Sequence, residues 1–235
     1  MVGVLHPGAM GAAIGSALRP RAGAVIWAAA GRSRATSKRA ELADLVGVPD
    51  TAAVARRSDV IVSVCPPHAA RAVADEVAAA LDPAPGGRIP VYVDANAVSP
   101  ATVQAIAARL GADHVVDGAI IGPPAWESGH TVLWLSGPAA ADVAELFAGS
   151  PFAAQRVLDA VTAGGEDALR GELDRMGVDF GAKLAGAARG ADKAWRWAGE
   201  MDEAADALAA VDLPDGFSRA AAELYRRLSD GRLAP

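Results

Sequence analysis

The chain is predicted to have an α/β fold, in which a doubly wound, mostly parallel sheet is followed by a short C-terminal all-α domain. Three observations indicate this. Apolar, strand-like runs alternate with alanine-rich helical stretches along most of the 235 residues, which is typical of a parallel sheet covered on both faces. The strand signal stops near residue 157, and helical periodicity continues alone. A glycine-bearing turn joins the first strand to the first helix.

The expected strands are short apolar runs bounded by Gly, Pro, Asp or Ser, and the expected helices lie between them. Strands are expected at Val2–Leu5, Ala24–Ala28, Val60–Val64, Val91–Asp94, Val115–Ile121 and Val132–Leu135. Helices are expected at Met10–Leu18, Ser37–Leu45, His68–Leu81, Pro100–Leu110 and Ala139–Phe147. Ser99 and Pro100 suit the N-cap and the first turn of one of these helices.

The sequence predicts two domains, residues 1–157 and residues 158–235. In the second, Met201, Leu208 and Val211 recur at helical spacing, and an amphipathic helix is expected over Phe217–Leu228. These helices are too few to bury a core of their own. We therefore expect them to pack on a second copy of the chain as a homodimer.

Composition narrows the function. The net charge is −6 and the hydrophobic fraction is 52%, which argues against nucleic-acid or anionic-membrane surfaces. The single cysteine, Cys65, excludes an internal disulfide and a cysteine-rich metal site, so no metal is expected, and it fits a reducing compartment. No apolar run reaches the ~18 residues of a membrane span. We expect a cytoplasmic protein with a small-molecule substrate.

The first turn predicts a dinucleotide site. Residues His6, Pro7, Gly8, Ala9, Met10 and Gly11 follow an apolar strand and open a helix. The fingerprint G-x-G-x-x-G of Rossmann-type domains is met at two of its three glycines, with His6 in the first place. Backbone at such a turn approaches a pyrophosphate closely, so side chains at Gly8 and Gly11 would obstruct it. The alternative is a purely structural turn.

The end of the second strand distinguishes the two nicotinamide cofactors, because the adenosine ribose lies there. No acidic residue precedes Glu41, whereas Arg32 and Ser33 could hold a 2′-phosphate. The sequence therefore favours NADP over NAD. The alternative is a solvated basic turn that enters a helix.

Later strand ends supply further candidates at the same edge of the sheet. Cys65, Pro66 and Pro67 follow the third expected strand and are interpreted as cofactor-lining residues, with Cys65 a small buried side chain rather than a nucleophile. Asn96 is placed to hydrogen-bond a substrate oxygen. Gly122 and Pro123 lie in a second substrate loop.

These landmarks, in this order, resemble the β-hydroxyacid dehydrogenase superfamily, which includes 6-phosphogluconate and 3-hydroxyisobutyrate dehydrogenases and imine reductases. Within it, the branch with a DUF1932-type C-terminal domain is the most similar. The resemblance covers residues 1–162 and 166–230. It is carried by the stretches His6–Gly11, Gly31–Ser33, Asp94–Pro100, Asp117–Pro124, Lys193–Met201 and Leu213–Phe217.

The resemblance also shows a departure. In these relatives a long helix with a Gly-x-x-x-Lys pattern follows the nucleotide domain, and its lysine exchanges a proton with the substrate. Here residues 161–166 run directly into a later part of the pattern, and that helix has no counterpart. The lysines of the chain are Lys38, Lys183 and Lys193. Lys193, beside two tryptophans, is the candidate substitute, with a solvated helix lysine as the alternative.

The sequence thus predicts an NADP-dependent oxidoreductase that transfers hydride between nicotinamide and a small hydroxy acid, carbonyl or imine, with Lys193 and Asn96 as candidate catalytic residues. The alternative is a non-redox biosynthetic enzyme, such as a cyclase, or a pseudoenzyme that retains the scaffold.

Overall fold

The computed structural model describes residues 1–81, 89–156 and 193–230. The chain divides into two compact units, Met1–Gly165 and Glu166–Pro235. The expected domain boundary at residues 157 and 158 lies outside the described residues and stays a prediction.

The described part of the first unit forms one eight-stranded sheet in the order β3-β2-β1-β4-β5-β6-β7-β8. The strands are β1 Val2–Leu5, β2 Val25–Ala28, β3 Val46–Val48, β4 Val60–Ser63, β5 Val91–Asp94, β6 Val115–Ile121, β7 Thr131–Ser136 and β8 Phe152–Arg156. All neighbours pair in parallel except β6 and β7, which are antiparallel. This confirms the predicted doubly wound, mostly parallel sheet.

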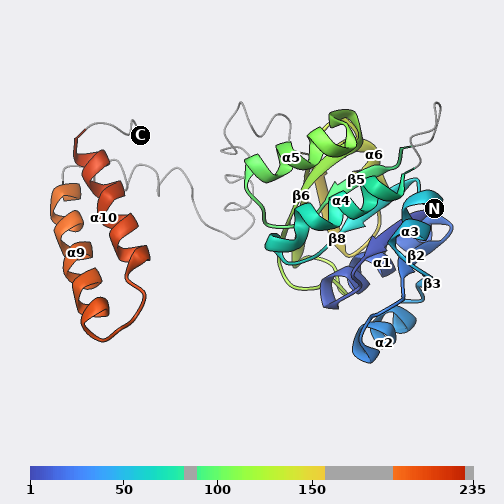
Figure 1. Cartoon of the computed structure of the whole chain (residues 1–235), viewed down its shortest axis with the longest axis horizontal. Coiled ribbons are helices and arrows are strands. Elements are labelled where there is room, and N and C mark those ends of the chain that lie inside the picture. The colour runs from blue at the N-terminus through green and yellow to red at the C-terminus, as the bar shows by residue number, and fades with distance from the viewer. Residues whose placement is uncertain (82–88, 157–192, 231–235) are drawn as a thin grey trace. The chain divides into compact units, whose positions relative to one another are not determined.

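Helices cover both faces of this sheet (Figure 1). The helices are α1 Ala9–Ala22, α2 Arg34–Leu42, α3 Thr51–Arg57, α4 Ala70–Ala80, α5 Pro100–Leu110 and α6 Ala140–Leu146, with short 3₁₀ turns η1 Pro67–Ala69 and η2 Ala112–His114. Alternate strand residues belong to different cores: Val4, Val62, Val93 and Val116 pack with α1 and α6, whereas Leu5, Ile61, Tyr92 and Val115 pack with α3, α4 and α5. The central strands β1, β4 and β5 are therefore buried on both faces, as their continuous apolar runs predict.

The sequence analysis missed three elements, β3, α3 and β8. β3 has three residues and two of them are exposed, so it carries little apolar signal. α3 is a seven-residue helix that begins where Asp50 accepts a hydrogen bond from the Ala53 N–H. β8 reads Phe-Ala-Ala-Gln-Arg, in which one large apolar residue marks the strand. α2 also begins at Arg34 rather than Ser37, because Ser33 caps it.

The described part of the second unit consists of α9 Ala194–Ala210 and α10 Gly216–Ser229, which pack against each other. This confirms the predicted C-terminal helices. Their buried positions hold small residues: Ala194, Ala198, Ala205, Ser218 and Ala222. The rings of Trp197 and Tyr225 lie 5.4 Å apart, and Arg226 pairs with Asp202 across the helices. No helix in the described ranges is long and apolar enough to cross a membrane.

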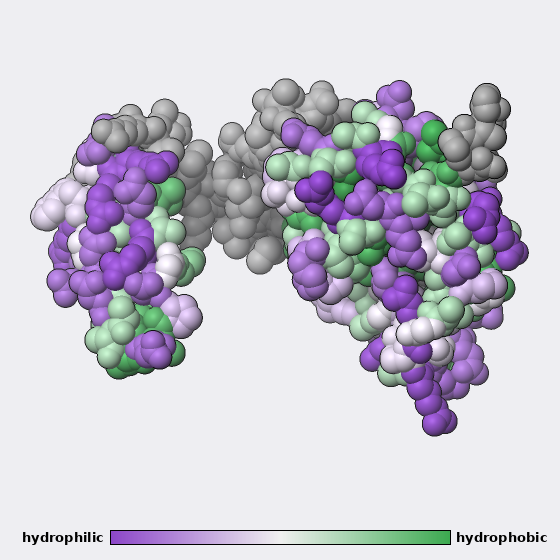
Figure 2. All heavy atoms as spheres, viewed as in Figure 1, coloured by the Kyte–Doolittle hydropathy of each residue, from purple (hydrophilic) through white to green (hydrophobic). Residues whose placement is uncertain are grey.

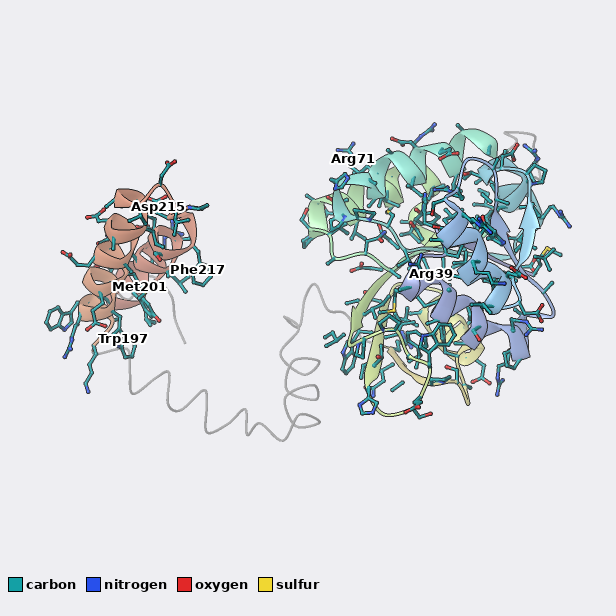
Figure 3. The ribbon with its side chains drawn as sticks, turned by 90° about the horizontal axis from the view of Figure 1, so that it is seen from below. Arg39, Arg71, Trp197, Met201, Asp215 and Phe217 are labelled. Carbon is teal, nitrogen blue, oxygen red and sulfur yellow. The ribbon has the colours of Figure 1, made fainter. Side chains whose placement is uncertain are left out.

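Large apolar side chains gather where α9 turns into α10. Val211 is 65% exposed, Leu213 53% and Phe217 87%. Figure 2 shows hydrophobic atoms at this end of the unit, and Figure 3 labels Phe217 on α10. The contact between the two helices therefore leaves much of their apolar surface uncovered.

Close packing of β1 against α3 yields a test of the fold. A Cβ on Gly3 would lie 2.6 Å from Ser58 Oγ and closer still to Val54, so Gly3→Ala is expected to lower the free energy of unfolding by about 1–3 kcal/mol. Gly47→Ala on β3 is the matched control, because its Cβ would meet Ala29 at an ordinary 3.5 Å. Denaturant unfolding measures both, and equal losses would contradict the packing described.

Candidate functional site

The candidate site lies where the strand order reverses. From β1 the chain builds outward through β2 and β3, then returns to place β4 on the other side of β1. Leu5 and Ser63 are register partners in the parallel β1–β4 pair, so the loops that follow these two strands leave the same edge side by side. Open α/β sheets bind ligands at such a point. The predicted cofactor residues His6–Gly11 and Cys65–Pro67 lie on these two loops.

The turn after β1 leaves the start of α1 without a cap. His6 adopts a left-handed φ of 65°, and the Gly8 N–H donates to the His6 carbonyl at 2.7 Å. Gly8 is the N-cap residue; no side chain accepts a hydrogen bond there, and the first turn of α1 holds no acidic residue. The N–H groups and the positive dipole end of α1 are thus free to bind an anion.

The two glycines of this turn, Gly8 and Gly11, have different surroundings. A Cβ on Gly8 would meet no atom within 4 Å, so the space above it is open. A Cβ on Gly11 would lie 2.6 Å from the His6 carbonyl oxygen. Gly11 is therefore required by the packing of α1 on its own turn, and its expected place at the cofactor stays a prediction. Gly8 alone has the open approach that a bound diphosphate needs.

The predicted phosphate clamp lies at the start of α2. The Ser33 hydroxyl caps this helix by accepting a hydrogen bond from the Thr36 N–H at 3.2 Å, which explains Ser33 without a ligand. Arg32 is half-buried, and its Nε is buried without a hydrogen-bond partner among the described residues. Arg32 therefore has an unused donor, whereas the hydroxyl of Ser33 already serves the fold.

Arg32 also acts on the first turn. Burial is the main cause that lowers the pKa of His6, and the positive charge of Arg32 adds to it, whereas Glu76 opposes it. His6 Nδ1 is buried and has no partner in the described part of the chain. His6 is therefore neutral near pH 7. Because its folded pKa lies below 6.5, its contribution to stability is complete above that pH and is lost as the pH falls through the folded pKa.

Asn96 lies at the centre of a hydrogen-bond network that joins the ends of β4 and β5. Its Oδ1 accepts from the Cys65 N–H at 2.6 Å, and its own N–H donates to Asp94 Oδ1 at 3.1 Å. Its Nδ2 donates to Asp94 Oδ1 and reaches Ser63 Oγ at 3.5 Å. The side chain is 6% exposed. The structure thus gives its amide protein partners, and the substrate contact expected from the sequence stays a prediction.

Asp94 and Asp117 form the acidic part of this region. They are register partners on the parallel strands β5 and β6, and Asp94 is fully buried, with its Oδ2 unpaired within the described residues. Burial raises the pKa of both carboxyls, and Asp117 raises that of Asp94 further. The sequence analysis assigned them no role. The sequence signal that could have identified them is a carboxylate at each of two neighbouring strands of the expected sheet.

The expected second substrate loop is a hairpin connection between β6 and β7. Gly122 has a φ of 130°, and a Cβ there would lie 2.6 Å from Thr131 Oγ1. Thr131 donates to the Pro123 carbonyl at 2.5 Å. Both residues are therefore explained by the hairpin, which leaves the edge of the sheet that also carries the first turn.

Lys193 lies in the second unit, where it is the N-cap residue of α9 and its side chain is exposed. Lys183 lies outside the described residues. Within these ranges, no three His, Cys, Asp or Glu side chains gather as metal ligands.

Comparison of the sequence with protein families identifies the C-terminal part. Residues 160–228 match the model of the domain of unknown function DUF1932. This confirms the branch that the sequence resembles. No sequence of a curated protein matches the chain.

Solved structures share the fold across nearly the whole chain. The conserved protein MTH1747, reported to resemble 3-hydroxyacid dehydrogenases, superposes with a TM-score of 0.57 at 23% identity, over 98% of this chain and 97% of its own. A reductive aminase from Aspergillus terreus, in complex with NADPH4, cyclohexanone and allyl amine, gives 0.62 at 15%, over 98% and 94%. An imine reductase variant from Myxococcus stipitatus with NAD+ gives 0.54 at 22%, over 100% and 78%. The fold is therefore that of 3-hydroxyacid dehydrogenase-like proteins.

The coupling between Arg32 and His6 can be measured. Arg32→Gln is expected to raise the pKa of His6 part of the way to 6.5, because it removes the positive charge while burial, the larger cause, remains. NMR titration of the His6 ring reports this directly. Arg34→Gln, at the next arginine along the chain, should leave the titration of His6 unchanged, and an equal shift in both variants would refute a specific effect of the Arg32 charge.

Proposed function

We propose that the chain is an NADP-dependent oxidoreductase that transfers hydride between the nicotinamide and a small hydroxy acid, carbonyl or imine. The observation that carries the proposal is the uncapped start of α1 beneath open space at Gly8, at the point where the sheet reverses its order. An anion there completes the hydrogen bonding of the helix. An imine reductase and a reductive aminase with the same fold support this reaction class, as does a protein reported to resemble 3-hydroxyacid dehydrogenases.

The position of Arg32 supports NADP. In this fold the adenosine half of a dinucleotide lies over the end of the second strand, where Arg32 has its unpaired Nε and no carboxylate stands before Glu41. A guanidinium binds a 2′-phosphate with two parallel hydrogen bonds. Structural relatives have been solved with NADPH4 and with NAD+, so the choice between the cofactors rests on Arg32.

The chain's own residues would hold the two ends of the cofactor apart. A diphosphate held over Gly8 and an adenosine over β2 would direct the nicotinamide half toward β4 and the Cys65–Pro67 loop. The nicotinamide would supply or accept the hydride. Gly122 and Pro123 leave the same edge of the sheet two strands farther on, and we propose that their loop borders the substrate.

A second candidate function is a non-redox enzyme or a pseudoenzyme, because neither candidate catalytic side chain is held in acid–base geometry in the described part of the chain. Asn96 is bound by protein groups and Lys193 is exposed at a helix start. General acid–base catalysis contributes about 10²- to 10⁴-fold, so a chain without it suits a non-redox enzyme or a pseudoenzyme that binds the same nucleotide. Reduction of a protonated iminium depends least on such a group. Consumption of NADPH with an imine, carbonyl or hydroxy-acid panel distinguishes these functions.

We also propose that the chain forms a homodimer through α9 and α10. The fully buried positions of the described part of these two helices hold small residues, and Phe217, Val211 and Leu213 stay exposed at one end. Trp195 and Leu224 are also more than half exposed. A second copy would cover such a surface, and sedimentation of the full chain tests this.

The dinucleotide site is tested by Gly8→Val. Because a Cβ at Gly8 meets nothing and its backbone is extended with a negative φ, the variant should fold with a stability within about 1 kcal/mol of the natural chain. It should lose the binding of both nicotinamide dinucleotides, since the side chain fills the diphosphate position. Isothermal titration calorimetry gives the affinity, and thermal unfolding the stability.

Gly11→Ala is the paired variant, and it should destabilise the fold, because its Cβ would press on the His6 carbonyl. Undiminished binding to Gly8→Val, or no binding of either cofactor to the natural chain at millimolar ligand, would refute the proposed function.

The cofactor preference is tested at Arg32. Arg32→Gln should weaken NADP+ binding about 10-fold or more, as expected for a lost charge-assisted hydrogen bond, and should change NAD+ binding little. Arg39→Gln, in the last turn of α2 (Figure 3), removes an equal charge at the other end of that helix. Parallel losses for both cofactors in Arg32→Gln would contradict the assignment of the 2′-phosphate.

A further inference from the structure

Cys65 carries the last backbone donor of the loop after β4 before its two prolines. Among Cys65, Pro66 and Pro67, only Cys65 carries an N–H, because proline has none. That N–H donates to Asn96 Oδ1 at 2.6 Å, across 31 residues of sequence. The two proline rings fix φ in the residues that follow. The direction of the whole loop is therefore set at Cys65 and secured by one side chain.

Asn96 is itself held on its other side. Its Nδ2 and its backbone N–H both donate to Asp94 Oδ1, and its carbonyl accepts from the Val98 N–H at 3.0 Å. Asp94 is the last residue of β5 and is fully buried. Asn96 thus links a loop to a rigid strand rather than to another loop.

The chemistry of this position suits an amide. One planar group must accept from the Cys65 N–H and donate to the Asp94 carboxyl in a site that is 6% exposed. Alanine would leave a buried donor and a buried acceptor without their partner, which is costly. An ionised aspartate keeps the acceptor but places a second negative charge against Asp94.

We propose that Asn96 is a positioning residue, which fixes the Cys65–Pro67 loop against the nicotinamide half of the bound cofactor. This rests on the proposed function, which places the adenosine half over β2 and Arg32, and so the nicotinamide half beside β4. Asn96 acts there through the backbone of Cys65 and touches neither cofactor nor substrate. Substitution of Asn96 should therefore weaken the binding of the nicotinamide half and not that of the adenosine half.

The test compares two ligands that share the adenosine half. NADP+ and 2′-phospho-ADP-ribose, which lacks the nicotinamide ring, are titrated calorimetrically into the natural chain, Asn96→Ala and the control Ser99→Ala. Ser99 lies three residues further on and caps α5 through the Thr102 N–H at 3.3 Å. Within the described residues, no hydrogen bond joins it to the Cys65–Pro67 loop. Asn96→Ala should weaken NADP+ about 10-fold and leave 2′-phospho-ADP-ribose within about twofold. Ser99→Ala should change neither.

Each outcome of these titrations supports or overturns the positioning role of Asn96. Unchanged NADP+ binding in Asn96→Ala, or equal losses for both ligands, overturns the positioning role. If Asn96→Ala does not fold, Asn96→Leu, which has nearly the same shape but no acceptor for the Cys65 N–H, is measured in its place, and the same difference between the ligands is required. If the natural chain binds 2′-phospho-ADP-ribose but not NADP+, the inference fails while the adenosine site stands. If it binds neither ligand, the proposed function fails first.

Discussion

The parallel pairing of β1 with β4 is the constraint on which the rest of the structure depends. It brings together two loops that are about 60 residues apart in the sequence and makes them leave the sheet at the same edge. Gly3 on β1 is required because α3 packs directly over this strand. The backbone of the first turn, the uncapped start of α1 and the Cys65–Pro67 loop are all placed by these few register contacts.

The sequence predicted the parts of the fold that carry a repeated apolar signal. Six of the strands are long apolar runs, and each lies within a residue of its expected bounds. β3 and β8 were missed because an edge strand with few large side chains is held by backbone pairing, and the pattern of apolar residues does not report such pairing. The start of α2 was missed because Ser33 was interpreted as a phosphate ligand rather than as a cap.

The candidate site was predicted as a set of positions but not as a set of contacts. The strand-end rule placed His6, Arg32, Cys65 and Asn96 on one edge, since it depends only on topology. It could not show that the amide of Asn96 bonds to Cys65 and Asp94, because such contacts depend on side-chain geometry between strands distant in sequence. Nor could it distinguish the two glycines, whose surroundings differ although their spacing is that of the motif.

The uncapped start of α1 has a consequence for the stability of the protein. Donors that neither side chain nor carboxylate satisfies are left to water, so an anion that occupies them adds its binding free energy to that of folding. The gain follows mass action and grows with the logarithm of ligand concentration once the site is mostly filled. On the proposed function, the resistance of this chain to unfolding and proteolysis would thus rise and fall with the nucleotide pool around it.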